Sequence, residues 1–89
     1  MDVEIELRNE TEKWLKKIKA ERKCIVLNNE KNKDFIKNID AYISDSEFFL
    51  KKGKLIEAFE AVIWSWAYMQ IGQDFGILSN QKGNIVLTK

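Results

Sequence analysis

The sequence contains no histidine and no proline, and its only cysteine is Cys24. Without histidine, the chain has no imidazole to act as a general base, to activate a serine or cysteine nucleophile, or to bind a metal. A single cysteine excludes an internal disulfide and a thiolate zinc site, and we expect its thiol to be inert. These absences remove the common catalytic classes, so we expect no enzymatic activity, no cofactor and no metal.

The chain also has little net charge, because 15 basic residues oppose 14 acidic ones. A net charge of +1 gives no overall electrostatic reason to bind nucleic acid or an anionic membrane. The longest apolar run, residues 61–69, is interrupted by Ser65, whereas a membrane span needs about 20 residues. The acidic start of the chain lacks the apolar core of a signal peptide. We therefore expect a single-domain, soluble, cytoplasmic protein without membrane contact.

Apolar residues recur at helical spacing in three segments, residues 3–23, 31–52 and 54–75. The segments have similar lengths and short connections, and Gly53 is placed to end the second of them. We predict an all-α fold, an antiparallel up-down-up three-helix bundle, in residues 1–78. Residues 79–89 are expected to form a C-terminal tail that is loosely packed or flexible.

Two short runs favour β-strands: Ile25 to Asn28 between the first two helices, and Ile85 to Thr88 in the tail. One interpretation pairs these runs as a two-stranded ribbon across one end of the bundle. The other makes the first run a loop that caps the core, while the tail packs loosely or frays. We favour the second interpretation.

The third helical segment is apolar nearly all round its axis, which is typical of a helix buried on several sides. Trp64 and Trp66 lie about 200° apart around a helix and cannot face the same neighbour. Two hypotheses remain open: all of these aromatic side chains are internal, or one row faces a partner protein or a second copy of the chain. That candidate interface row is Trp64, Tyr68, Ile71 and Phe75.

Charge is segregated along the first helical segment. Residues 1–12 hold five acids and one arginine, whereas residues 13–23 hold six bases and one acid. Acids near the start of a helix and bases near its end interact favourably with the helix dipole, and each well-placed charge stabilises the helix by about 0.3–1 kcal/mol. We therefore interpret this pattern as a solvated helix surface. The alternative is a nucleic-acid contact through a candidate basic patch, which consists of Lys13, Lys16, Lys17, Lys19, Arg22 and Lys23.

Carboxylates are the only acid or base candidates that remain. Glu57 and Glu60 share one helix face, but metal sites in helical bundles pair such a glutamate with a histidine, so we expect surface roles for both. Ser46 interrupts an apolar row between Ile43 and Leu50, where a small polar side chain would allow two helices to approach closely. Neither feature indicates catalysis.

Residues 44–78 contain a turn flanked by two helical segments with a recognisable set of residues: Phe48, Phe49, Leu50, Gly53, Ala58, Phe59, Glu60, Trp64, Trp66 and Gly72. Together with Thr11 to Leu15 in the first helical segment, this pattern resembles the archaeal family known as domain of unknown function 357 (DUF357). The resemblance implies a compact three-helix bundle in an archaeal cytoplasmic protein, and the family has no assigned activity. Lys54 departs from the family pattern, in which an aspartate after the turn glycine would cap the third helix.

The sequence therefore favours a non-enzymatic module that makes protein–protein contacts or self-associates through its third helix. An accessory nucleic-acid-binding protein that uses the basic end of the first helix is the alternative.

Overall fold

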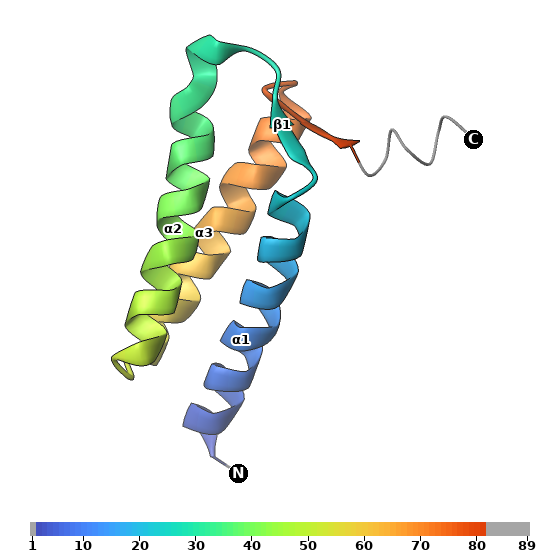
Figure 1. The fold of residues 1–89 in the computed structure, drawn as a ribbon. Coiled ribbons are helices and arrows are strands. Elements are labelled where there is room, and N and C mark those ends of the chain that lie inside the picture. The colour runs from blue at the N-terminus through green and yellow to red at the C-terminus, as the bar shows by residue number, and fades with distance from the viewer. Residues whose placement is uncertain (1, 82–89) are drawn as a thin grey trace, which may run out of the picture.

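The computed structural model describes residues 2–81. In order, the elements are α1 Val3–Arg22, β1 Ile25–Leu27, the 3₁₀ turn η1 Glu30–Asn32, α2 Lys33–Lys51, α3 Leu55–Asp74 and β2 Leu78–Asn80. The helices run up, down and up, and the strand pair lies at one end (Figure 1). The predicted helical bundle is confirmed, and its helix ends lie within two residues of the expected positions.

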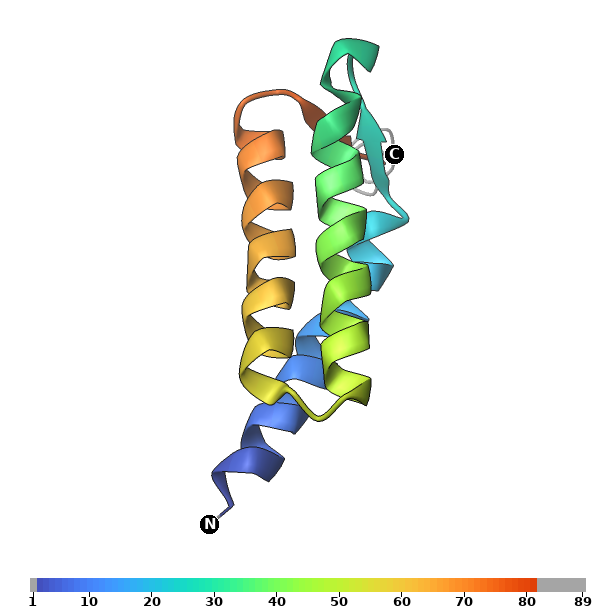
Figure 2. The ribbon, with the colours of Figure 1, turned by 90° about the vertical axis from the view of Figure 1, so that its left-hand side faces the viewer.

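Aliphatic side chains from all three helices form the core. Ile18 of α1, Ile39 of α2, and Val62 and Met69 of α3 are each at most 1% exposed. Burial of an aliphatic side chain of this size stabilises a fold by about 1.5–3 kcal/mol. The contact between α2 and α3, which lie side by side, is the most extensive between helices, whereas the N-terminal end of α1 extends past the turn that joins them (Figure 2).

Glycine ends both α2 and α3. Gly53 and Gly76 have φ of 76° and 74°, a left-handed conformation that other residues adopt at a cost. At the first of these turns, the Lys54 N–H donates to the Phe49 carbonyl at 2.9 Å. At the second, the Ile77 N–H donates to the Gly72 carbonyl at 2.8 Å. These contacts satisfy carbonyls that a helix end would otherwise leave unpaired, and Gly53 ends α2 as the sequence predicted.

The start of α3 has no side-chain cap, because Lys54 at the N-cap position makes no capping hydrogen bond. We expect Lys54→Asp to raise the free energy of unfolding by about 1 kcal/mol. The new carboxylate would accept a hydrogen bond from the first turn and would face the positive end of the helix dipole. Urea titration measures the change. Lys54→Ala removes the same charge without adding a cap, so an equal gain from alanine would contradict the capping explanation.

The strand pair joins the first connection to the chain that follows α3. β1 and β2 are antiparallel, with Ile25 opposite Asn80 and Leu27 opposite Leu78. Two further backbone hydrogen bonds, from Asn28 to Ile77 and from Gln81 to Cys24, extend the pairing. The favoured interpretation of residues 25–28 as a loop is therefore wrong. The alternative partner, Ile85 to Thr88, lies outside the described residues.

Tertiary contacts explain why residues 78–80 form the strand. Their sequence, Leu-Ser-Asn, has little β-propensity, but the Gly76 turn returns the chain alongside β1. Leu78 and Ile25 then enter the core, 2% and 4% exposed. Residues 79–81, which we assigned to the tail, lie in or beside this strand pair, and residues 82–89 are outside the described part of the chain. Within residues 2–81, no helix combines the length and apolar character that a membrane crossing requires.

Candidate protein interface

The two tryptophans of α3 face different surroundings, as their spacing predicted. Trp66 turns towards α1, where its ring meets the Trp14 ring edge-on with centroids 5.7 Å apart. Its Nε1–H also donates to the Trp14 carbonyl at 3.3 Å. Trp64 is directed away from this contact and is 55% exposed. The apolar circumference of α3 is therefore divided between a packed side and an exposed side.

The exposed side of α3, which we call the outer face, is covered by no segment within residues 2–81 (Figure 2). Its large side chains are Ile56, Ile63, Trp64, Ile71 and Phe75, which are 66%, 43%, 55%, 42% and 77% exposed. Exposed apolar patches of this kind mark interaction sites in soluble proteins. Three of the four predicted interface residues lie on this face, so the hypothesis that all the aromatic side chains are internal does not hold.

Tyr68, the fourth predicted residue, lies half-buried at the edge of the outer face. Its ring centroid is 5.3 Å from that of Phe35 and 5.6 Å from that of Tyr42, both on α2. Tyr42 also stacks against Trp64, with centroids 6.3 Å apart and an interplanar angle of 23°. This aromatic cluster restrains the exposed Trp64 ring, so a partner that covers it would lose less side-chain entropy on binding.

Sequence reasoning did not identify Ile56 and Ile63 as part of this surface. They lie seven residues apart on α3, on the side nearer α1, and both are exposed. The available signal was that the apolar surface of α3 is wider than two neighbouring helices can cover. Periodicity showed that excess width, but it did not show which side remains uncovered.

A shallow apolar groove between α1 and α3 borders the outer face. It has a volume of about 360 Å³ and is lined by Trp14, Ile63, Trp66, Ala67 and Gln70. On the α1 side, the Lys17 and Lys13 Nζ atoms lie 4.7 and 5.6 Å from the Trp14 ring centroid. Because Ile63 belongs to both surfaces, the groove continues the outer face to the edge of α1.

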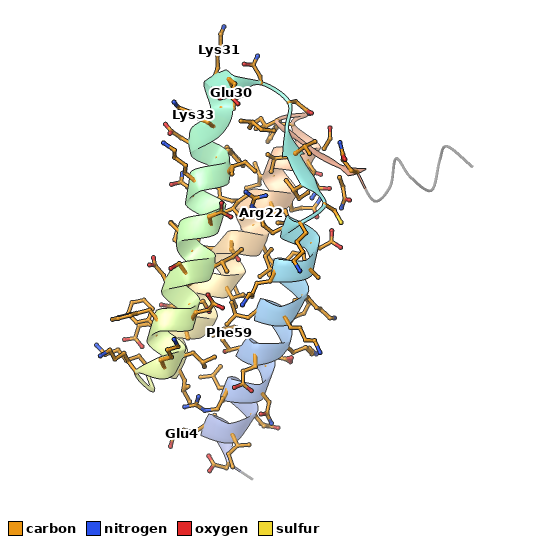
Figure 3. All side chains as sticks on the ribbon, viewed as in Figure 1. Glu4, Arg22, Glu30, Lys31, Lys33 and Phe59 are labelled. Carbon is orange, nitrogen blue, oxygen red and sulfur yellow. The ribbon has the colours of Figure 1, made fainter. Side chains whose placement is uncertain are left out.

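The candidate basic patch is largely engaged in contacts within the chain. Arg22 lies near the end of α1 (Figure 3). It forms two hydrogen bonds with the Asp40 carboxylate, at 2.6 and 3.0 Å, and so links α1 to α2. Lys19 pairs with Glu47 of α2. Together with Lys13 and Lys17 on the Trp14 ring, four of the six basic residues thus have local partners. The other two, Lys16 and Lys23, are exposed along a groove between α1 and α2.

The polar residues singled out in α2 and α3 lie on the surface or take part in packing. Across residues 2–81, no group of three or more acidic or cysteine side chains is placed to hold a metal ion. Glu57 and Glu60 are exposed. Ser46 is fully buried, and its Oγ donates to the Ala58 carbonyl at 2.7 Å. Its small size allows α2 to approach α3, which is a role in packing.

Residues 8–78 match the family described as protein of unknown function (DUF357). The chain belongs to the DUF357 family. A DUF357 protein from Archaeoglobus fulgidus, whose crystal structure is known, shares 47% sequence identity with this chain. The two structures superpose with a TM-score of 0.82, and the match covers 89% of this chain and 99% of that chain. Comparison with curated proteins finds no match. The resemblance seen in the sequence is confirmed, and the DUF357 description names no activity.

Proposed function

We propose that this DUF357 protein is a non-enzymatic module that acts through protein–protein contact, self-association included, at the outer face of α3. The exposure of five large apolar side chains on one side of a single helix carries this proposal. Removing apolar surface from water stabilises a complex by about 25 cal/mol for each Å² buried. The outer face therefore offers a favourable free energy of association to a partner of matching shape.

Binding of nucleic acid through the basic patch is less well supported. Four of its six residues already contact acids or an aromatic ring within the chain. The exposed ring of Trp64 is also a poor stacking platform for bases, because α3 contains no lysine or arginine to hold the phosphates beside it.

Photo-crosslinking tests the proposed function. Benzoylphenylalanine replaces Trp64 or Phe75 on the outer face, and Lys37 on the exposed side of α2 serves as the control position. We expect a discrete crosslinked product from the two outer-face positions only, identified by mass spectrometry as two copies of the chain or as the chain joined to one defined protein. Equal products from position 37, or none from the outer face, would contradict the proposal. RNA or DNA binding that weakens steeply with salt would favour the alternative.

A further inference from the structure

We propose that the occupant of the outer face is a second copy of this chain, bound antiparallel about a two-fold axis. This inference rests on the proposed function and specifies its partner. An isologous interface requires a surface that is complementary to itself after a two-fold rotation. The outer face supplies apolar area, and a row of charges beside it on α1 supplies the complementarity.

The row consists of Glu6, Glu10, Lys13 and Lys17, which we call the charged stripe. Their spacing of four, three and four residues places them on one side of α1. Lys13 and Lys17 lie over the ring of Trp14, which lines the groove that continues the outer face. Lys13 also pairs with Glu10 of its own chain at 2.9 Å, and both side chains remain about half exposed to a second partner. The stripe thus runs beside the apolar surface, with two acids followed by two bases.

The change of sign occurs at the level of the middle of the outer face. Trp66, near the centre of α3, contacts Trp14 of α1, one residue after Lys13. Because α1 and α3 run in the same direction, their acidic and basic ends can be compared level by level (Figure 1). A two-fold axis perpendicular to the helices at this level turns one copy end over end.

That rotation brings the acids of each stripe to the bases of the other. Glu6 comes to the level of Lys17 of the second copy, and Glu10 to the level of Lys13 of the second copy. A parallel two-fold pairing, whose axis runs along the helices, instead carries each stripe to the opposite edge of the other copy's outer face, so the two stripes do not meet. The stripes therefore attract each other only in the antiparallel arrangement.

Two of the three acids of α3, Glu57 and Asp74, do not oppose this arrangement, because they lie about 100° apart around the helix, on opposite edges of the outer face. End-over-end rotation keeps each edge on its own side, so Glu57 of one copy does not meet Asp74 of the other. The third, Glu60, is exposed and lies between Ile56 and Ile63 on the outer face itself, so a covering chain must leave its carboxylate hydrated or paired. Ile56, near the start of α3, comes to the level of Ile71 in the second copy.

The apolar area suits a dimer of modest size. From their exposed fractions, the five outer-face side chains present on the order of 500 Å² per chain. Covering two such faces buries about 1,000 Å², close to the lower end of the roughly 1,200–2,000 Å² of stable interfaces. The groove and the charged stripe add to this area and bring it within that range.

Sedimentation equilibrium of the full chain and of two charge-reversed chains tests the inference. One carries Lys13→Glu and Lys17→Glu, and the other carries Glu6→Lys and Glu10→Lys. Each stripe then has one sign, so we expect the dissociation constant of each homodimer to rise about tenfold or more. An equimolar mixture should restore dimers, because an acidic stripe then meets a basic one. The unaltered dimer should weaken as salt increases.

The matched control carries Lys33→Glu and Lys37→Glu on the exposed side of α2, with the same change of net charge as the chain that carries Lys13→Glu and Lys17→Glu. It should dimerise like the unaltered chain, and circular dichroism should show that all variants are folded. An unaltered chain that stays monomeric at high micromolar concentration would overturn the second copy as partner, whereas an outer-face crosslink to another protein would preserve the proposed function. A dimer whose dissociation constant is unchanged in both charge-reversed chains, or which is strengthened by salt, would contradict the antiparallel pairing of the charged stripes, while self-association itself would stand.

Discussion

Replacing Ile18 with alanine is expected to lower the free energy of unfolding by about 2–5 kcal/mol. Ile18 is fully buried, and α1 contributes only Thr11, Leu15 and Ile18 to the buried interior. Removing its side chain loses apolar contacts and leaves a cavity between α1 and the α2–α3 pair. Small domains have a total stability of about 5–15 kcal/mol, so this substitution removes a large share of it. Urea or thermal denaturation measures the loss.

Ile5→Ala supplies the matched control, because Ile5 lies on the same helix and is 58% exposed. We expect its effect to remain within about 0.5 kcal/mol. The ion pair that joins Arg22 to Asp40 is partly exposed, so Arg22→Gln should cost no more than about 1 kcal/mol. If Ile18→Ala were as mild as either control, the observed docking of α1 would be contradicted. The comparison separates core packing from surface charge as the source of that docking.

Gly72→Ala is expected to destabilise the protein by about 1–3 kcal/mol, although alanine is the better helix former. A Cβ atom at this position would lie 2.5 Å from Leu78 Cδ1 and 3.0 Å from Phe35 Cε1. Leu78 is 2% exposed, so its side chain has little room to move away. Comparing the urea midpoints of the two proteins measures the effect.

A Leu78→Ala background provides the control for Gly72→Ala. Removing the leucine side chain leaves only the 3.0 Å approach to Phe35 Cε1, so the loss caused by Gly72→Ala should be much smaller in this background. An equal loss in both backgrounds would show that the contact with Leu78 is not the cause. Comparing Gly72→Ala in the two backgrounds therefore tests whether α3 needs a glycine where the Leu78 side chain of β2 packs against it.

Local sequence patterns predicted most of the helical architecture. The 3.6-residue period in residues 31–52 led to α2, and Gly53 led to its end, because a left-handed residue after a helix depends on only a few neighbouring positions. The separation of Trp64 from Trp66 also follows from helix geometry. The strand pair could not be predicted in this way, since β2 has little β-propensity of its own and depends on where the Gly76 turn returns the chain.

The candidate interface was predictable in part. Sequence alone was sufficient for three helices, for a third helix with more apolar surface than two neighbouring helices can cover, and for the reversal of charge along α1, because each depends on residue spacing within one segment. The tertiary structure decided that Trp66 is packed and Trp64 exposed, that Ile56 and Ile63 join the outer face, and that Lys19 and Arg22 pair with α2. These outcomes depend on how the helices pack against one another. The residue spacing within one segment does not show on which of its sides the other helices will lie.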